Sequence, residues 1–314
     1  MIPNVAHFIW YGRTLPWLHA MSIVSAARKG RFEHLVLHHA DELDAASRDR
    51  LAALTPPSQP ALELRKIAPA QVFGRDARGR RLRALHSELT QPAARANMLR
   101  AALLEAEGGV YLDMDTVTLQ SFQPLMAAEA FCGVEPVAFP AALRQRPSIG
   151  GYARAYALAG LRTWLRREPR GPRYFPHVAH LFTMAVNNAI VGARAGHPLL
   201  AQVLDRMLVL PADVQRRRYA LGTHLLQTVL EESDSKGLVV HPQPVFYPLG
   251  PQLSEHWFRV KSQLRLSDVI GPETFAVHWY ASVRTRHWVD RIDPSFVRQH
   301  TRDQLISGLL ASYA

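Results

Sequence analysis

Two acidic residues separated by one position, Asp113 and Asp115, are the side chains of this 314-residue chain best placed to do chemistry. If the backbone around them is extended, both carboxylates point to one side and Met114 points to the other. Like charges held that close are unfavourable unless a cation or strong hydrogen-bond donors lie between them. Oxygen ligands suit a hard ion such as Mg²⁺ or Mn²⁺, which keeps waters and bridges substrate phosphates. The pattern predicts a metal–diphosphate site, with a solvated loop as the alternative.

A helix and a double glycine must deliver the chain to this acidic pair. Thr90-Gln91-Pro92 is typical of a helix start, and Gly108-Gly109 is typical of a helix end. The apolar run Val110–Asp113 then predicts a strand. Because α/β sheets bind ligands beyond the carboxyl ends of their strands, the two acids stand where a ligand is expected.

Strand-like and helix-like segments alternate through the first third of the chain. Strands are predicted at Val5–Trp10, Leu35–His39 and Leu62–Ile67, with helices at Leu15–Arg28 and Asp41–Leu54. This alternation predicts an α/β fold with a largely parallel sheet. Residues 140–180 mix Pro, Gly, Arg and aromatic residues and predict a less regular, partly helical excursion. We expect residues 1–314 to form a single catalytic domain.

The composition limits the class of protein and its compartment. Lys and Arg outnumber Asp and Glu by 37 to 26, so the surface should attract phosphates, acidic glycans, nucleic acid or an anionic membrane. The lone Cys132 excludes an internal disulfide framework and favours a reducing compartment. The chain starts without a secretory signal pattern, and no apolar run reaches the roughly 20 residues of a membrane span. A cytoplasmic protein is predicted, with room for peripheral contact at the inner membrane face.

A constellation around the acids resembles a known enzyme family. Asn97-Met98-Leu99-Arg100, Leu103-Leu104 and Glu107-Gly108-Gly109-Val110-Tyr111-Leu112-Asp113-Met114-Asp115 follow one another with the family's spacing. They resemble the DXD-containing sugar transferases, which include bacterial capsule and polysaccharide enzymes, yeast-type mannosyltransferases and clostridial glucosylating toxins. The opening run Pro3 to Gly12 (PNVAHFIWYG) resembles the family's first strand.

The resemblance implies a fold and an activity. The fold is GT-A type, with a Rossmann-like, mostly parallel central sheet flanked by helices. The activity is Mn²⁺- or Mg²⁺-dependent transfer of a hexose from a nucleotide-diphosphate sugar to an acceptor hydroxyl, as in polysaccharide biosynthesis, with retention of anomeric configuration. UDP-hexose is the favoured donor and GDP-mannose the alternative. The acceptor is a glycan, a lipid-linked intermediate or a protein.

The resemblance also assigns roles to residues near the acids. Asp113 and Asp115 bind the metal, with His278 as the third ligand, although the following Tyr280-Ala281-Ser282 departs from the family's commoner ending. Arg100 shares a helix face with Asn97, at i and i+3, and should reach sugar hydroxyls or the diphosphate. A salt bridge to a neighbouring strand is its alternative role.

The remaining assignments concern the donor and its sugar. Trp10 is expected to stack on the nucleotide base, and Tyr111 to line the donor pocket, with core packing as the alternative for both. Asn97 replaces the aspartate that the family usually has, so it can bind a sugar hydroxyl but carries no charge. Four further residues are placed near the sugar or acceptor by resemblance alone: Asn188, His197, Gly222 and Thr223.

Two other classes of protein compete with this hypothesis. Asp113 and Asp115 also resemble the nucleophile strand of haloacid-dehalogenase-type phosphatases, although Lys261 and Asp268 imitate the rest of that machinery poorly. A basic nucleic-acid- or glycan-binding module would explain the positive charge. No nucleic acid partner is expected, because aromatic residues are not interleaved with the basic runs. The basic runs Arg75–Arg83 and Arg216–Arg218 are interpreted as solvated loops, with an anionic acceptor or lipid headgroups as the alternative ligand of Arg75–Arg83.

Overall fold

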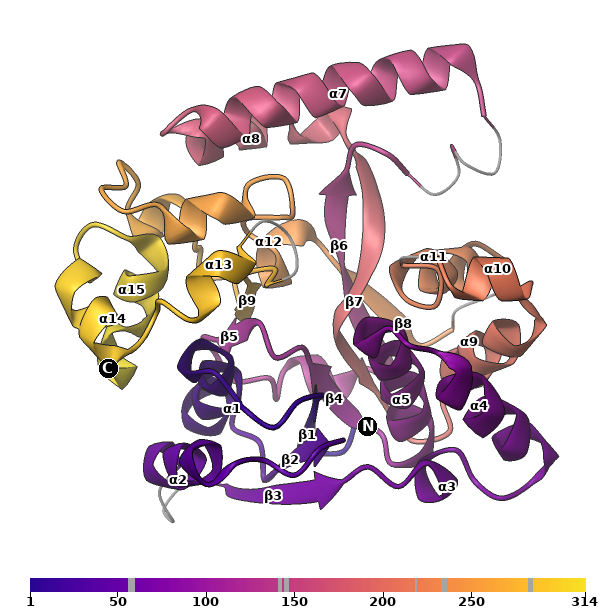
Figure 1. Ribbon diagram of the computed structural model, residues 1–314. Helices are drawn as coiled ribbons and strands as arrows, with labels where there is room; N and C mark the ends of the chain where they lie inside the picture. The colour runs from indigo at the N-terminus through magenta and orange to yellow at the C-terminus, as the bar shows by residue number, and fades with distance from the viewer. Residues whose placement is uncertain (56–59, 141–142, 144–146, 218, 233–235, 282–284) are drawn as a thin grey trace.

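A seven-stranded sheet in the order β3-β2-β1-β4-β7-β6-β8 forms the centre of the computed structural model (Figure 1). The strands are β1 (Val5–Trp10), β2 (His34–His39), β3 (Ala61–Lys66), β4 (Gly109–Leu112), β6 (Ala130–Val137), β7 (Thr183–Ala193) and β8 (Leu238–His241). Only β7 runs against its neighbours β4 and β6, and the other pairs are parallel. The predicted mostly parallel sheet is confirmed.

The structure describes residues 1–55, 60–140, 143, 147–217, 219–232, 236–281 and 285–314. Arg218 and Ser282, both named in the sequence analysis, lie outside these ranges.

Helices cover both faces of the sheet. On one face lie α1 (Trp17–Lys29) and α2 (Ala45–Leu54), and on the other lie α5 (Pro92–Ala106), α9 (Pro198–Val209) and α11 (Thr223–Glu232). Alternate residues of each strand face opposite sides, so Val110 and Leu112 pack into the α1 core while Tyr111 packs into the α5 core. The result is the helix-flanked α/β architecture that the sequence predicted.

The other elements are short or lie outside the central layers. The α-helices are α3 (Pro69–Val72), α4 (Ala77–Glu88), α7 (Ile149–Arg167), α8 (Gly171–Val178), α10 (Ala212–Gln215), α12 (Gln243–Phe246), α13 (Arg286–Val289), α14 (Pro294–His300) and α15 (Leu305–Leu310). The 3₁₀ turns are Leu125–Ala127, Ala179–Leu181, Ser254–Phe258, Leu266–Asp268 and Ala311–Tyr313. The helices α13 to α15 gather at the C-terminal end of the chain (Figure 1).

The double glycine before β4 is required by its geometry. Gly108 and Gly109 have φ angles of 69° and 104°, in the left-handed region that favours glycine. A Cβ on Gly108 would lie 2.6 Å from the Ala195 nitrogen, and one on Gly109 would lie 2.8 Å from the Val5 oxygen. The turn therefore brings β4 tightly against β1, with Ala6 opposite Val110.

The arginine-rich segment Arg75–Arg83 differs from the prediction. It is not a solvated loop: most of it forms the start of α4, whose first turn is capped by the Asp76 carboxylate accepting from the Gly79 nitrogen at 2.7 Å. Arg78 bonds Glu105 at 2.9 Å and Asp205 at 2.6 Å. These ion pairs attach α4 to α5 and α9, a tertiary role that the local charge pattern did not reveal.

A separate two-stranded sheet closes over the end of β4. It pairs β5 (Thr116–Thr118) with β9 (Ala276–His278) in antiparallel register, with Thr116 opposite His278. This pairing brings a residue from late in the chain next to Asp115. The sequence had predicted neither β5 nor β9.

The segment that follows β6 extends away from the sheet. Helix α7 has 19 residues and lies with α8 across one end of the molecule, where β6 and β7 lead into it (Figure 1). It is more regular than the excursion predicted for residues 140–180. Over the described residues, no helix combines the length and apolar character that crossing a membrane requires.

Candidate active site at the Asp113-Met114-Asp115 turn

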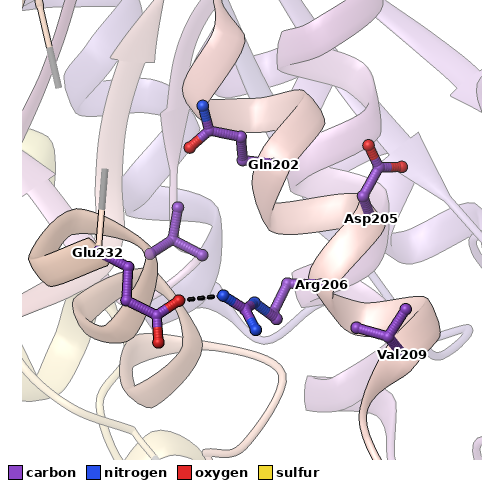
Figure 2. Close-up of a pocket in the computed structure, with 6 residues that line it drawn as sticks. Gln202, Asp205, Arg206, Val209 and Glu232 are labelled. Carbon is purple, nitrogen blue, oxygen red and sulfur yellow. Dashed lines mark hydrogen bonds and ion pairs between the residues drawn. The ribbon is translucent and has the colours of Figure 1, made fainter. Parts of the chain in front are cut away.

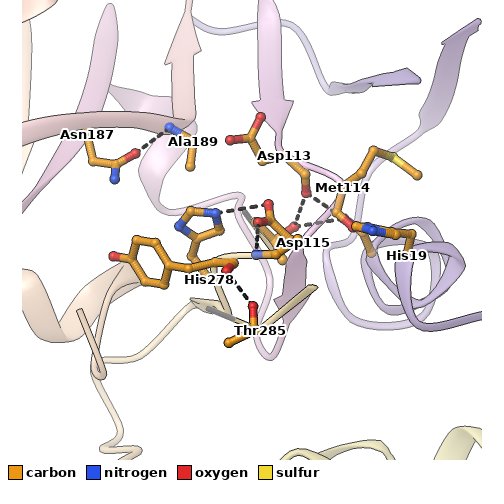
Figure 3. Close-up of polar contacts among 12 residues, drawn as sticks. His19, Asp113, Met114, Asp115, Asn187, Ala189, His278 and Thr285 are labelled. Carbon is orange, nitrogen blue, oxygen red and sulfur yellow. Dashed lines mark hydrogen bonds and ion pairs between the residues drawn. The ribbon is translucent and has the colours of Figure 1, made fainter. Parts of the chain in front are cut away.

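The chain leaves β4 through a tight turn whose backbone is fixed by distant elements (Figure 3). Strand β4 ends at Leu112, so Asp113 to Asp115 form a turn and not the extended segment predicted. The Ser22 hydroxyl of α1 donates to the Asp113 oxygen at 2.9 Å, and a ring nitrogen of His19 lies 2.8 Å from the Met114 oxygen. The two carboxylates lie close together because these contacts shape the turn, and strand alternation is not the cause.

The Asp113 carboxylate is held from the side of α5 and β4. Its Oδ1 accepts from the Arg100 guanidinium at 2.6 Å and from the Tyr111 hydroxyl at 2.7 Å. Arg100 also donates to the Asn188 carbonyl and lies over the Tyr111 ring, 4.1 Å from its centre. Arg100 is only 6% exposed, and its ion pair with Asp113, directly after β4, is the alternative role that the sequence analysis gave it.

The Asp115 carboxylate is held from the opposite side, by β9 and the residues after it. His278 Nε2 lies 2.9 Å from Oδ1, and the Ala281 amide donates to Oδ2 at 2.6 Å. The Trp279 amide also donates to the Asp115 carbonyl at 2.9 Å. The β5–β9 pairing is the cause of these contacts, because it aligns His278 with the residue that follows Asp115.

Burial and neighbouring charges separate the acidities of the two carboxyls. Burial raises the pKa of Asp113, Arg100 opposes this, and the charge of Asp115 adds to it. Burial also acts to raise the pKa of Asp115, but His278 outweighs it and brings that pKa to about 2. Burial lowers and Asp115 raises the pKa of His278, with Asp115 prevailing. Asp115 and His278 therefore form an ion pair.

The three side chains fit a divalent cation. One ligand atom each of Asp113, Asp115 and His278 lie within 4.8 Å of one another, the only such cluster found over the described residues. The Asp113 side chain keeps 26% of its surface exposed. His278 Nδ1 is buried without a hydrogen-bond partner among the described residues, while Nε2 contacts Asp115, so His278 would have to release its proton to bind a metal ion. Two carboxylates and one imidazole suit Mn²⁺, since imidazole is a better ligand for transition ions than for Mg²⁺.

A second cluster brings together residues predicted for the sugar. Asn188 of β7 donates its amide to Asn97 Oδ1 of α5 at 2.9 Å. A Cβ built on Gly222 would lie 2.6 Å from Asn97 Nδ2 and 3.2 Å from Asn188 Nδ2. Thr223 begins α11 directly after this glycine. Because Asn188 also offers its carbonyl to Arg100, the amide cluster adjoins the acidic turn.

Trp10 and His197 lie in different surroundings. Trp10 ends β1, half-buried, with its ring centre 5.0 Å from that of His19, which contacts the acidic turn. Its indole Nε1 has no hydrogen-bond partner among the described residues. His197 is buried and its Nδ1 accepts from the Leu199 amide at 3.3 Å. His197 is thus the N-cap of α9, and this structural role accounts for it.

Two residues that support the site were missed by the sequence analysis. The Tyr280 hydroxyl donates to Glu135 Oε2 at 2.6 Å, and the Tyr280 ring centre lies 4.0 Å from that of His278. Burial raises the pKa of the Glu135 carboxyl, although Tyr280 lowers it in part. Tyr280 also has a φ of 58°, an unusual conformation for a side-chain-bearing residue. A positive φ has no sequence signature, so nothing local could have revealed this contact.

Two surface hollows lie away from the acidic turn. One of about 470 Å³ lies between α9 and α11, towards the end of α11 far from Thr223, and is bridged by Arg206 and Glu232 (Figure 2). A second borders Leu89 and Arg216. No residue predicted for the site lines either of them, and ion-paired surface side chains account for the first.

The structure does not bring Lys261 and Asp268 to the acidic turn, as the phosphatase hypothesis would require. Asp268 is paired with Arg173 of α8 at 2.8 Å, and Lys261 is exposed. Neither residue contacts Asp113 or Asp115 in the structure. Neither of these two residues supplies Asp113 with the lysine or the paired aspartate that the phosphatase chemistry requires.

The fold and the site together define the class of protein. The sheet has one reversed strand, helices on both faces and an Asp-x-Asp turn after its central strand, so the protein is of the α/β class. Residues 36–132 match the family model described as "Glycosyltransferase sugar-binding region containing DXD motif". The matched region is less than half of the chain and includes Asp113 and Asp115, so the chain contains a region similar to the DXD region of this glycosyltransferase family. A comparison with curated protein sequences found no match.

Several solved structures are distantly similar. Mouse xyloside xylosyltransferase 1 has 14% identity and a TM-score of 0.48, over 88% of this chain and 98% of that one. The PaToxG glycosyltransferase has 14% identity and a TM-score of 0.43, over 74% and 69% of the two chains. The UDP-bound glycosyltransferase domain of the YGT toxin has 9% identity and a TM-score of 0.41, over 77% and 79%. These likenesses are weak, with TM-scores below 0.5.

Proposed function

We propose that the protein transfers a hexose from a nucleotide-diphosphate sugar, UDP-hexose in the first place, to an acceptor hydroxyl with retention of configuration. The observation that carries the proposal is the convergence of Asp113, Asp115 and His278 within 4.8 Å at the end of β4. Asp113 and Asp115 lie within residues 36–132, the region that matches the family model, and His278 lies outside it. GDP-mannose remains the alternative donor, and the acceptor is a glycan, a lipid-linked intermediate or a protein.

The proposed chemistry places the diphosphate at the acidic turn. Asp113, Asp115 and His278 would hold a divalent ion, which would supply positive charge to stabilise the departing diphosphate. Arg100 and Tyr111 hold Asp113 in position, and the Ala281 amide does the same for Asp115. Arg100 is therefore proposed as a positioning residue, in place of the direct substrate contact first expected.

The sugar is proposed to lie on the amide cluster beside the turn. Asn97 and Asn188 carry side-chain amides that can donate to and accept from sugar hydroxyls. Gly222 keeps the space beside them open, and Thr223 offers a hydroxyl at its edge. Trp10, half-buried beside His19, is proposed to stack on the nucleotide base.

With retention, the departing phosphate oxygen itself can take the proton of the acceptor hydroxyl. No dedicated catalytic base is then needed from the chain. The protein residues then need only to position the donor and to exclude competing water. This fits a turn whose backbone oxygens are bonded by residues of α1 and by Trp279, which directly follows β9.

A donor screen tests the proposal. The protein is incubated with UDP-glucose, UDP-galactose, UDP-N-acetylglucosamine or GDP-mannose, with and without Mn²⁺, and nucleotide release is measured. We expect release from one donor, dependent on Mn²⁺. Release of phosphate from an aryl phosphate, with no nucleotide released from any donor, would support the phosphatase alternative instead.

A further inference from the structure

Helix α7 exposes an apolar stripe to solvent. Ile149, Tyr152, Tyr156 and Trp164 are spaced so that they share one face of the helix. Ile149 is 92% exposed, Tyr156 67% and Trp164 52%. Such an array is unusual on a water-facing helix, because large apolar side chains normally face the core.

Tyr174 of the following helix widens this stripe. Its ring stacks on Trp164 with centres 6.1 Å apart, and it is itself exposed. We call Ile149, Tyr152, Tyr156, Trp164 and Tyr174 the α7 surface. Of the thirteen large hydrophobic residues exposed over the described part of the chain, seven lie between positions 149 and 184.

The opposite face of α7 attaches the helix to the body. Ala155, Leu158 and Leu165 are buried on that side. Arg166 pairs there with Glu255 at 3.4 Å, and Arg162 donates to Gln252 at 3.2 Å. The helix is therefore anchored by one face, and its apolar outer face is left uncovered by the described residues (Figure 1).

The segment around the stripe is strongly basic. Residues 140–182 contain eight arginines and a single acidic residue, Glu168. Among the described residues Arg154, Arg167 and Arg170 are exposed and are not paired with any carboxylate. Arg167 follows Trp164 by three positions, so it lies on the same face as the stripe.

We propose that the α7 surface docks onto an anionic phospholipid membrane. Tyrosine and tryptophan favour the headgroup level of a bilayer, and an exposed isoleucine inserts its side chain below it. Unpaired arginines at the rim bind lipid phosphates. Since β6 and β7 run from α7 and α8 to Glu135 and Asn188, docking holds the acidic turn at a fixed height above the bilayer (Figure 1).

Vesicle flotation tests the proposal with the full chain. Vesicles of phosphatidylcholine alone are compared with vesicles of phosphatidylcholine and phosphatidylglycerol, and we expect the protein to float only with the latter. The double variant Tyr156→Ser/Trp164→Ser should lower the bound fraction about tenfold or more, because it removes the inserted rings. Trp164→Phe, which keeps an aromatic ring, should retain most of the binding.

Two charge-reversal variants distinguish docking through the α7 surface from attraction of the whole basic protein to anionic lipid. Arg167→Glu should weaken flotation at least about fivefold, the effect of losing one cation at the surface. Arg48→Glu changes the charge equally, but on α2, which lies at the far end of the molecule from α7 (Figure 1). It should weaken flotation by less than about twofold, because distant charges are screened. All variants change exposed residues, and unchanged melting temperatures check that they fold.

Three results would overturn the proposal. The first is a protein that does not float with anionic vesicles, or floats equally with phosphatidylcholine alone. The second is equal loss of flotation in the Arg167 and Arg48 variants. The third is a dimer by light scattering that Tyr156→Ser/Trp164→Ser converts to a monomer without any effect on flotation, which would assign the surface to a second copy of the chain.

Discussion

The acidic turn and the α7 surface contrast in how their side chains and backbone are used. At the turn the carbonyl oxygens of Asp113, Met114 and Asp115 each accept a hydrogen bond from another part of the chain. On α7 the side chains of Tyr156 and Trp164 extend into solvent. The first region holds polar atoms in one geometry, as a small charged ligand requires. The second offers apolar area over several helical turns, as an extended partner requires.

Removing the Asp115 carboxylate from the acidic turn should give the largest loss of nucleotide release. Asp115→Asn is expected to lower Mn²⁺-dependent nucleotide release about 100-fold or more, because it removes a negative ligand and the ion pair with His278. Asp49→Asn, an equal change on the exposed face of α2, should leave release unchanged. Full activity of the Asp115 variant in a nucleotide-release assay would contradict the proposal that the acidic turn, and not another region of the molecule, binds the metal and the donor.

Adding one methyl group to each region sharpens the contrast. Gly222→Ala places a Cβ 2.6 Å from Asn97 Nδ2, so the sugar cluster must shift, and we expect donor turnover to fall about tenfold. Gly160→Ala on α7 meets nothing within 4 Å. It should leave turnover unchanged and add about 0.5–1 kcal/mol of stability through helix propensity. Steady-state kinetics and thermal melts measure both, and equal kinetic effects would contradict the assignment of Gly222.

Low pH should destabilise the fold through the buried histidine pair His7 and His38, which lies against the Gly108-Gly109 turn. His38 Nε2 lies 3.0 Å from His7 Nδ1, and the other nitrogen of His7 lies 3.0 Å from the Gly108 carbonyl. Burial, with a smaller contribution from His7, lowers the pKa of His38 to about 3. The unfolded chain binds this proton near pH 6.5 and the folded chain does not, so stability is complete above pH 6.5. The contribution of His38 to the free energy of unfolding then falls by about 1.4 kcal/mol per pH unit as the pH drops towards 3.

The variant His38→Gln isolates this effect. It removes one of several buried histidines with a lowered pKa and should reduce the slope of the free energy of unfolding against pH between 6.5 and 4, with His86 and His256 keeping part of that slope. His34→Gln on the same strand, where the side chain is exposed, is the control and should leave the slope as it is. Identical slopes for His38→Gln and the unmodified protein, measured by denaturant unfolding, would show that the pair does not titrate as described.

The smallest expected change concerns the residue that departs from the family pattern. Asn97→Asp keeps an acceptor for the Asn188 amide, so the fold should be unaffected. A carboxylate accepts stronger hydrogen bonds from sugar hydroxyls than an amide does, and we expect kcat/KM for the donor to rise about fivefold. Asp at position 97 lowering kcat/KM would indicate that the amide donates a hydrogen bond that the sugar needs.

The sequence predicted local elements well and long-range contacts poorly. β1 has the predicted bounds, and α5, the double glycine and β4 follow in the predicted order, because hydrophobic periodicity and glycine placement are local signals. The turn at Asp113 and the helix over Arg78 were predicted wrongly, as an extended segment and a loop. Both are decided by tertiary contacts, with α1 in one case and with Glu105 and Asp205 in the other.

Residues of the site that are far apart in the chain were found only where a family resemblance pointed to them. His278 was predicted in this way, and the β5–β9 register explains its position. Glu135 and Tyr280 are 145 residues apart and form a hydrogen bond that no spacing rule signals. Arg100 and Asp113 were both identified, and a salt bridge of Arg100 to a neighbouring strand was one of its two expected roles, but the sequence did not name Asp113 as its partner because side-chain direction depends on the fold.

Binding of Mn²⁺ in the presence of UDP, followed by electron paramagnetic resonance of the free ion, tests the central claim most directly. The account predicts that one ion per chain is removed from solution by the unmodified protein and that Asp113→Asn/Asp115→Asn abolishes this binding. Undiminished Mn²⁺ binding by the double variant, with its melting temperature unchanged, would contradict a metal site at the Asp113-Met114-Asp115 turn.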